Sequence, residues 1–430
     1  MTDFLCVPGQ VLRGHISVPG DKSISHRFVM LASIAHGRST ASNLLTGEDC
    51  ISTVNAFRSM GVNIKLSGTC CVVDGVGKNG LKAPKEPLFL GNSGTTMRLL
   101  SGLLAGQGFD VTLEGDESLA KRPMDRVVLP LRAMEAHIYG IGERINPPLQ
   151  IKSSRLHGAT HVEKLGSAQV KSSLLLAGLY AEGTTTVIEK KRSRDHTERM
   201  FDLFGARFTK EGNILKVDGT SSLDAVDDLL IPGDISSAAF FIVAGLIIPG
   251  SGLVIRDVCL NPTRIGILDV LKQMGAHIEI KVKRSAGEPC GDISVRHSKL
   301  RAVTVSEDRL PFLIDEIPIL MVACAFAQGQ SCIMNASELR VKETDRIESM
   351  ATGLRALGAE IAIENDTITI MGKTQLQGDA EVESYDDHRT AMSLIVAGLA
   401  SEKAVTVKNT GCIAISYPDF VDDLRLSLGA

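Results

Sequence analysis

The sequence predicts an α/β protein of two domains, in which each domain consists of three copies of one strand–helix–strand–helix–strand–strand unit. Two observations predict this class: one residue pattern recurs six times along the chain, and a second pattern recurs in phase with it. The size agrees, because 430 residues, of which 44% are hydrophobic, exceed what a single hydrophobic core accommodates.

The first pattern is a polar opening followed by an apolar run of helical spacing that usually ends at a glycine. The copies recur roughly every 70 residues, which is a spacing typical of supersecondary units. They begin at Gly20, Gly91, Gly166, Gly233, Asp315 and Asp386. Because small polar residues before an apolar run are typical of a helix N-terminus, we expect one helix at the start of each repeat.

The second pattern is the end of another helix, then a small residue, then an alternating strand. In every copy but one, the small residue is a glycine. Glycine is favoured there because a helix commonly ends with a residue in the left-handed backbone conformation, which glycine adopts easily. The exception carries Glu135. The glycines are Gly61, Gly205, Gly275, Gly358 and Gly429.

The sixth repeat ends at Leu428-Gly429-Ala430, before its closing strands. The strand-like run Gln10–Pro19 belongs to no repeat helix, and we expect it to complete the sixth repeat. One domain then spans residues 21–231, and the other combines residues 1–20 with 232–430.

The chain crosses between these domains at Pro19-Gly20 and at Ile231-Pro232-Gly233, and both crossings contain the proline and glycine that are typical of a hinge. A solenoid or a ring is the alternative architecture. The repeats are long for a solenoid, and the runs Phe240–Ile248 and Leu320–Ala327 carry no basic residue with which to line a ring around DNA. We therefore favour a two-domain enzyme with a cleft.

The composition narrows the functional class. The net charge is 46 − 50 = −4, which argues against a general nucleic-acid or membrane-surface binder. The nine cysteines form no CxxC pair, as expected of free thiols in a reducing compartment without a zinc site. No apolar stretch reaches the roughly 20 residues of a membrane span, and the N-terminus lacks the features of a signal peptide. We expect a cytoplasmic protein that binds any anionic ligand through local basic clusters.

Three of the helix openings combine backbone N–H groups with cations, as an anion site requires. They are Asp21–Arg27, Asn92–Arg98 and Ser167–Lys171. An ordinary helix cap with a solvated basic face is the alternative, but three copies in register favour a shared anion site.

Further cations follow the repeat strands, in the segments Ala120–Pro123, Val341–Arg346 and Tyr385–Arg389. Two acids lie among the cations: Asp315 opens the fifth helix, and Glu343 stands between Lys342 and Arg346. Either acid could serve as a general base. For Asp315 the alternative is a plain helix cap, and for His26 and His388 we favour structural roles.

These motifs resemble, in order and from end to end, the family of 5-enolpyruvylshikimate-3-phosphate synthases. The specific signatures are LGNSGTTMR (90–98) and RVKETDR (340–346), supported by PGDKSISHR (19–27), AKRPMDR (120–126), GSAQVKSSLLLAGL (166–179), SRDHTERM (193–200), DEIPIL (315–320) and DDHRTAM (386–392). The resemblance implies two inside-out α/β domains, each of three βαβαββ repeats, with the active site in the interdomain cleft and no metal or organic cofactor.

The resemblance also implies the reaction: transfer of the enolpyruvyl group of phosphoenolpyruvate to the 5-hydroxyl of shikimate 3-phosphate, with release of phosphate. It implies small-molecule partners, without nucleic acid or membrane, and we expect a monomer. Domain 21–231 would mainly bind shikimate 3-phosphate.

The family's site residues carry over onto matching positions. Asp315 would be the base towards the 5-hydroxyl, Glu343 the acid towards the methylene carbon, and Lys22 a further catalytic residue. Shikimate 3-phosphate would contact Lys22, Ser23, Arg27, Ser167, Ala168, Gln169, Arg194, Asp315 and Lys342. Phosphoenolpyruvate would contact Lys22, Gly94, Arg122, Gln169, Arg346 and Arg389.

One departure and several rivals remain. Gly411 stands where many members of the family carry a lysine that contacts phosphoenolpyruvate. The enolpyruvyl transferase that acts on UDP-N-acetylglucosamine typically has Lys-Asn at Lys22-Ser23, and a loop cysteine that this chain lacks between Cys71 and Cys259. A non-catalytic anion-binding protein would not need Asp315 and Glu343, and the cues of an RNA 3′-phosphate cyclase are absent.

Overall fold

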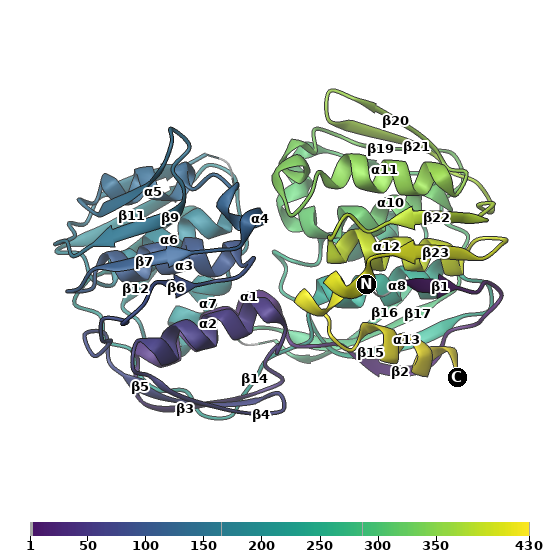
Figure 1. The fold of residues 1–430 in the computed structure, drawn as a ribbon. Helices are drawn as coiled ribbons and strands as arrows, with labels where there is room; N and C mark the ends of the chain where they lie inside the picture. Colours follow the sequence, from purple (N-terminus) through teal and green to yellow (C-terminus); the bar gives the residue numbers. More distant parts are fainter. Residues whose placement is uncertain (1–2, 165, 286, 430) are drawn as a thin grey trace. The chain divides into compact units, whose positions relative to one another are not determined.

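The structure is a computed structural model that describes residues 3–164, 166–285 and 287–429. The chain divides into two compact units (Figure 1). The continuous unit is Gly20–Ile231, and the discontinuous unit joins Met1–Pro19 to Pro232–Ala430. Each unit contains three small sheets within the described residues.

The first sheet of the continuous unit has the strand order β14-β3-β5-β4. Its helices and strands are α1 (Lys22–Ile34), β3 (His36–Ser42), α2 (Glu48–Ser59), β4 (Asn63–Ser67), β5 (Cys70–Val76) and, from the end of the unit, β14 (Leu229–Leu230).

The second and third repeats follow one plan, in which the strand before the inner helix pairs in parallel with the strand after it, and a hairpin is added antiparallel. The second repeat comprises β6 (Leu88–Phe89), α3 (Gly94–Ala105), β7 (Val111–Glu114), α4 (Glu117–Ala120), α5 (Asp125–Arg132), β8 (His137–Ile141) and β9 (Asn146–Lys152). The third comprises β10 (Thr160–Glu163), α6 (Ala168–Gly178), β11 (Thr184–Glu189), α7 (His196–Leu203), β12 (Phe208–Glu211) and β13 (Ile214–Asp218).

The discontinuous unit repeats the plan with 3₁₀ turns added. The fourth repeat comprises β2 (Arg13–Ser17), α8 (Ile235–Ile247), β15 (Gly252–Cys259), α9 (Gly266–Gln273), β16 (His277–Arg284) and β17 (Cys290–Arg296). The fifth comprises β18 (Thr304–Val305), η1 (Glu307–Phe312), η2 (Ile314–Glu316), α10 (Ile317–Ala325), β19 (Gln330–Ile333), η3 (Ser337–Val341), α11 (Arg346–Ala356), β20 (Glu360–Glu364) and β21 (Thr367–Met371). The sixth comprises β22 (Ala380–Glu383), α12 (His388–Leu399), β23 (Val405–Lys408), η4 (Thr410–Ile415), α13 (Phe420–Leu428) and β1 (Phe4–Cys6).

The run Gln10–Pro19 does not complete the sixth repeat, so that expectation from the sequence is wrong. Its strand, β2, pairs in parallel with β15 of the fourth repeat, and the strand that pairs with β23 is β1. The reason lies at the crossings. The strand before α8 is β14, which pairs with β3 in the continuous unit, so the first place in the fourth sheet is open to β2.

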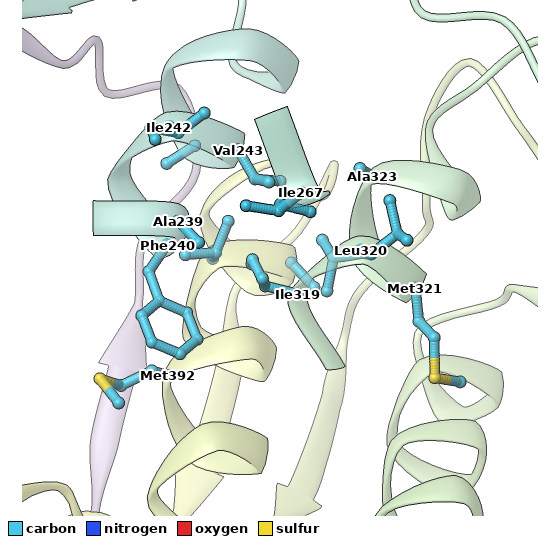
Figure 2. Packing of buried hydrophobic residues seen from close by; sticks show 14 of the residues in the cluster. Ala239, Phe240, Ile242, Val243, Ile267, Ile319, Leu320, Met321, Ala323 and Met392 are labelled. Atoms are coloured by element: carbon cyan, nitrogen blue, oxygen red, sulfur yellow. The ribbon is translucent and has the colours of Figure 1, made fainter. Parts of the chain in front are cut away.

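Buried helices form the core of the discontinuous unit. Every residue of α8, α10 and α12 is buried, and the three helices pack on one another. Figure 2 shows Phe240 and Val243 of α8 near Ile319 and Leu320 of α10. A helix that is apolar on all sides must be covered on all sides, and here the sheets do so. This confirms the inside-out arrangement that the resemblance implied.

The inner helices of the continuous unit, α1, α3 and α6, are buried except near their first residues. Lys22, Ser23, Thr95 and Gln169 remain partly exposed there. The repeat therefore leaves polar helix N-termini accessible at the ends of a buried core, where an anionic ligand can reach them.

Candidate active site

Asp21 fixes the start of α1, because its Oδ1 accepts a hydrogen bond from the Ile24 backbone N–H at 3.0 Å. Lys22 and Ser23 therefore lie in the first turn. The Lys22 Nζ lies 3.0 Å from Asp49 Oδ2 on α2, and both side chains keep limited exposure (17% and 11%). The ammonium group is thus oriented by a carboxylate while it remains open to a ligand.

Arg27 lies further along α1 and is nearly buried. Its guanidinium donates to Ser23 O (2.9 Å), Thr197 Oγ1 (2.8 Å) and Ser172 Oγ (2.7 Å). These acceptors belong to α1, α7 and α6. Arg27 therefore connects the first repeat with the third and is held in one orientation.

His26 is buried, and its Nδ1 lies 2.7 Å from Thr53 Oγ1. Burial, and then the charges of Lys22 and Arg27, lower the pKa of His26 well below its usual 6.5. The imidazole is neutral near pH 7, which fits a structural residue rather than an anion ligand.

Gly94 begins α3 between two arginines. A Cβ at this position would lie 3.0 Å from Arg98 Nη1 and 3.3 Å from Arg122 Nη1. Arg122 donates to Asn92, including a short contact with Asn92 Oδ1. Arg98 Nη1 donates to Gln169 Oε1 at 2.9 Å. Gly94, Arg122 and Gln169 are thus brought together around Arg98.

Arg98 is the cation of the second predicted anion-binding opening, Asn92–Arg98, but the resemblance assigns it no substrate contact. It lies four residues after Gly94, so both residues lie on the same side of α3. That spacing was the available signal for its place beside Gly94.

The opening of α6 carries Ser167, whose Oγ accepts from the Val170 backbone N–H at 3.4 Å. Ser167, Ala168 and Gln169 are all partly exposed. Lys171 is not part of this opening, so its predicted place in the anion-binding cluster is wrong. It is fully buried, because one turn into the helix the chain faces the core, where two glutamates pair with it.

Arg194 lies between β11 and α7 and is partly exposed. The continuous unit thus contributes the predicted residues Lys22, Ser23, Arg27, Gly94, Arg122, Ser167, Ala168, Gln169 and Arg194.

Asp315 belongs to η2, and α10 has no side-chain cap, so Asp315 is not the plain cap of that helix. Its Oδ1 lies 3.4 Å from Lys342 Nζ and 3.5 Å from Arg346 Nη1. Lys342 and Arg346 are like charges four residues apart, an unfavourable spacing unless an anion lies near both. Asp315 is one such anion.

Arg346 is buried and is surrounded by carboxylates. Its Nη2 lies 2.5 Å from Glu343 Oε2, and its Nε lies 2.8 Å from Asp387 Oδ2. Burial alone would lower the pKa of Arg346, but the charges of Asp387, Glu343 and Asp315 outweigh it and raise the pKa above its usual value. The guanidinium is therefore permanently charged, and it holds the carboxylates of Asp315, Glu343 and Asp387 around it.

Asp387 also caps α12, since its Oδ1 accepts from the Arg389 and Thr390 backbone N–H groups. Arg389 is nearly buried, and its Nη1 donates to the backbone oxygen of Asp315 at 2.9 Å. The discontinuous unit thus gathers five of the predicted site residues: Asp315, Lys342, Glu343, Arg346 and Arg389.

Residues 7–424 match the family model of EPSP synthase (3-phosphoshikimate 1-carboxyvinyltransferase). The chain belongs to this family. It is 50% identical over 426 residues to the 3-phosphoshikimate 1-carboxyvinyltransferase of Citrifermentans bemidjiense, with 99% of each chain covered. It is 48% identical to that of Bacillus pumilus, over 96% of this chain and 97% of the relative.

Solved structures agree. EPSP synthase from Acinetobacter baumannii matches with a TM-score of 0.88 at 43% identity, covering 99% of this chain and 98% of that one. The enolpyruvyl transferase NikO from Streptomyces tendae matches with a TM-score of 0.80 at 20% identity, covering 100% and 98%, which shows the shared fold alone. The resemblance and the fold class expected from the sequence are confirmed.

Within this EPSP synthase family member, Gly411 is exposed and lies in η4 next to Cys412. Burial raises the pKa of the Cys412 thiol to about 11. A hydrogen bond with Ser384 lowers this pKa, and the negative charges of Asp387 and Asp386 raise it further. The thiol is protonated near pH 7 and is no nucleophile.

Among the described residues, no three His, Cys, Asp or Glu side chains are grouped as a metal site would need. Over the same part of the chain, no helix has the length and apolar character to cross a membrane.

Proposed function

We propose that this chain transfers the enolpyruvyl group of phosphoenolpyruvate to the 5-hydroxyl of shikimate 3-phosphate and releases phosphate. The observation that carries the proposal is the family match over residues 7–424. The charge distribution supports it, because both substrates are anions and the candidate residues include many cations. Three of these cations, Lys22, Arg346 and Arg389, lie in the first turn of a helix.

The continuous unit supplies the residues for shikimate 3-phosphate. Lys22, Ser23 and Arg27 offer an ammonium group, a hydroxyl and a guanidinium on one helix, α1. The opening of α6, Ser167 to Gln169, adds backbone N–H and side-chain donors, and Arg194 adds a further cation. Asp315 and Lys342 of the discontinuous unit complete the set that the family resemblance implies.

Phosphoenolpyruvate needs donors for a carboxylate and a phosphate. Arginine presents a planar fork that binds either group through two parallel hydrogen bonds. Arg122, Arg346 and Arg389 are assigned to this task, together with Lys22 and Gln169. Gly94 leaves room beside Arg122, because a Cβ there would approach its guanidinium.

The chemistry is an addition followed by an elimination. Asp315 removes the proton of the 5-hydroxyl while the hydroxyl oxygen attacks C2 of phosphoenolpyruvate. Glu343 donates a proton to C3, which becomes a methyl group. In the resulting ketal, Glu343 takes a proton back from C3 as the bond from C2 to the phosphate oxygen breaks. As that bond breaks, the proton held by Asp315 passes to the departing phosphate. The enol ether and phosphate result, with Asp315 again a carboxylate and Glu343 again protonated.

Glu343 must hold a proton for the first step, yet in the structure it pairs with Arg346. We propose that the anionic groups of phosphoenolpyruvate take over the Arg346 guanidinium as they bind. The ion pair with Arg346, which favours the carboxylate form of Glu343, is then weakened, and the protonated form becomes more favourable.

Two further proposals concern the whole protein: the enzyme acts in the cytoplasm, and it acts as a monomer. The cysteines support the first, because none of those that the structure describes forms a disulfide. A sedimentation measurement checks the second, with one species of 45.9 kDa expected.

The test of function measures phosphate release from phosphoenolpyruvate with shikimate 3-phosphate and, separately, with UDP-N-acetylglucosamine as acceptor. We expect release with shikimate 3-phosphate only. Release with only the UDP-sugar would mean that the acceptor assignment is wrong. Binding of both anions without release would favour a non-catalytic protein.

A further inference from the structure

Lys171 is a fully buried cation that the proposed reaction does not use. It lies on α6, whose first residues are assigned to shikimate 3-phosphate. Its Nζ lies 2.8 Å from Glu198 Oε1 and 3.0 Å from Glu189 Oε1. An unpaired buried ammonium group would be very costly, so pairing is expected. The informative feature is which segments the two carboxylates belong to.

Glu189 ends β11 and anchors the loop that follows. Its Oε1 accepts from both the backbone N–H (3.0 Å) and the hydroxyl (2.6 Å) of Ser193. Arg194 is the next residue. Lys171 therefore balances the charge of the carboxylate that fixes the backbone from which Arg194 extends.

Glu198 lies on α7 directly after Thr197, which accepts from Arg27 Nε. The Thr197 hydroxyl in turn donates to Ser172 Oγ at 2.7 Å, and Ser172 accepts from Arg27 Nη2. Since Ser172 follows Lys171 in α6, the Lys171–Glu198 pair joins the same two helices that hold the Arg27 guanidinium.

We propose that Lys171 is a positioning residue for the shikimate 3-phosphate site. Through Glu189 it holds Arg194, and through Glu198 it holds Arg27, both relative to the N-terminus of α6. The inference rests on the proposed function. Stability alone does not require such a buried triad, because well-packed apolar side chains often replace one at no cost.

The test titrates shikimate 3-phosphate into the Lys171→Met variant in a calorimeter, without phosphoenolpyruvate. We expect the Kd to rise on the order of 10- to 100-fold, as for a displaced binding group. The KM for phosphoenolpyruvate should change far less, because Arg122, Arg346 and Arg389 are not held by Lys171.

Lys78→Met is the matched control. The Lys78 Nζ donates to the backbone oxygens of Leu179 (2.8 Å) and Gly219 (2.7 Å), at the opposite end of α6. This variant should lose stability and keep the wild-type Kd for shikimate 3-phosphate.

An unchanged Kd in Lys171→Met, or an equal rise in the KM of both substrates, would overturn the inference. If Lys171→Met does not fold, the Ser193→Ala variant tests the positioning role instead. It removes the hydroxyl bond to Glu189, and we expect about a fivefold rise in Kd; no rise would refute the positioning role. Wild-type protein that does not bind shikimate 3-phosphate would overturn the proposed function as well.

Discussion

Arg346 contacts carboxylates from three segments of the discontinuous unit: Asp315 in η2, Glu343 before α11, and Asp387 before α12. Together with Lys342 and Arg389, the cluster holds three cations and three carboxylates. On the proposed function, phosphoenolpyruvate competes with these carboxylates for Arg346. We therefore expect the proposed acid, Glu343, and the proposed base, Asp315, to change partners when substrate binds, which is when their protonation has to change.

Glu343→Gln keeps the shape of the side chain and removes the proton donor. We expect kcat to fall about 100-fold or more, since a positioned general acid contributes at least that much. The KM values for both substrates should change little. Steady-state phosphate release measures both constants.

Glu338→Gln is the matched control, because Glu338 Oε1 lies 3.9 Å from Lys342 Nζ but is about half exposed. It should leave kcat near the wild-type value. Equal turnover in Glu343→Gln and wild type would remove Glu343 from the proton-donor role.

At the residue scale, sequence patterns located the site but not its internal contacts. Glu343 and Arg346 are three residues apart, so local spacing brings them together. Asp315 meets Lys342 only through the tertiary fold. Lys171 was misjudged because a lysine in a polar motif resembles a ligand until its burial is known.

The buried His26 makes stability depend on pH. Its pKa is lowered by folding, so the unfolded chain binds the proton more readily between the folded pKa and the unfolded value near 6.5. Stability is therefore full above pH 6.5 and is lost as the pH falls from 6.5 towards the folded pKa, by up to about 1.4 kcal/mol per pH unit.

We expect His26→Gln to flatten this loss, measured as the free energy of unfolding in urea between pH 7 and pH 5. His15→Gln, which changes an exposed histidine, is the control and should keep the wild-type slope. A slope that is the same in His26→Gln and wild type would contradict the assignment.

At the element scale, the outer helices end in the left-handed conformation. Gly61, Gly205, Gly275 and Gly358 all have φ between +70° and +96°. Glu135 has φ +70°, so it adopts the same conformation without being glycine. The repeat thus fixes the backbone conformation even where the sequence departs from its pattern.

Glu135→Gly should raise the free energy of unfolding by about 0.5 kcal/mol. The left-handed conformation costs a non-glycine residue about 1–2 kcal/mol, and the greater freedom of glycine in the unfolded chain offsets part of this gain. The exposed contact with His157 contributes little. Urea denaturation monitored by circular dichroism measures the change.

Gly275→Ala is the opposite substitution at the equivalent position. Its Cβ would meet no atom closer than 4.0 Å, so only backbone strain is added. It should lower stability by about 1 kcal/mol. A loss of stability in Glu135→Gly would mean that the side chain contributes more than its backbone strain costs.

At the scale of the whole molecule, the sixfold repeat was predictable because its signals are local: polar helix openings, helix-ending residues and alternating strands. The pairing of β2 with β15 was not predictable, because the paired residues, such as Ile16 and Ile255, lie far apart in the sequence. Nothing in a short strand states which of several similar sheets it joins. The sheet that β2 joins is set by the crossing between the units. Because β14 pairs with β3 in the continuous unit, the edge of β15 is left for β2.

This topology makes the two units unequal as fragments. Residues 20–231 contain every strand of their three sheets, including β14. Residues 232–430 lack β1 and β2, and with them the buried residues Cys6, Leu12 and Ile16. We expect fragment 20–231 to fold alone with a cooperative thermal transition by circular dichroism. Fragment 232–430 should fold only when a peptide of residues 1–19 is added, because β15 and β23 otherwise each lose a partner strand. A cooperative transition of 232–430 without the peptide would show that the N-terminal strands are dispensable for its core.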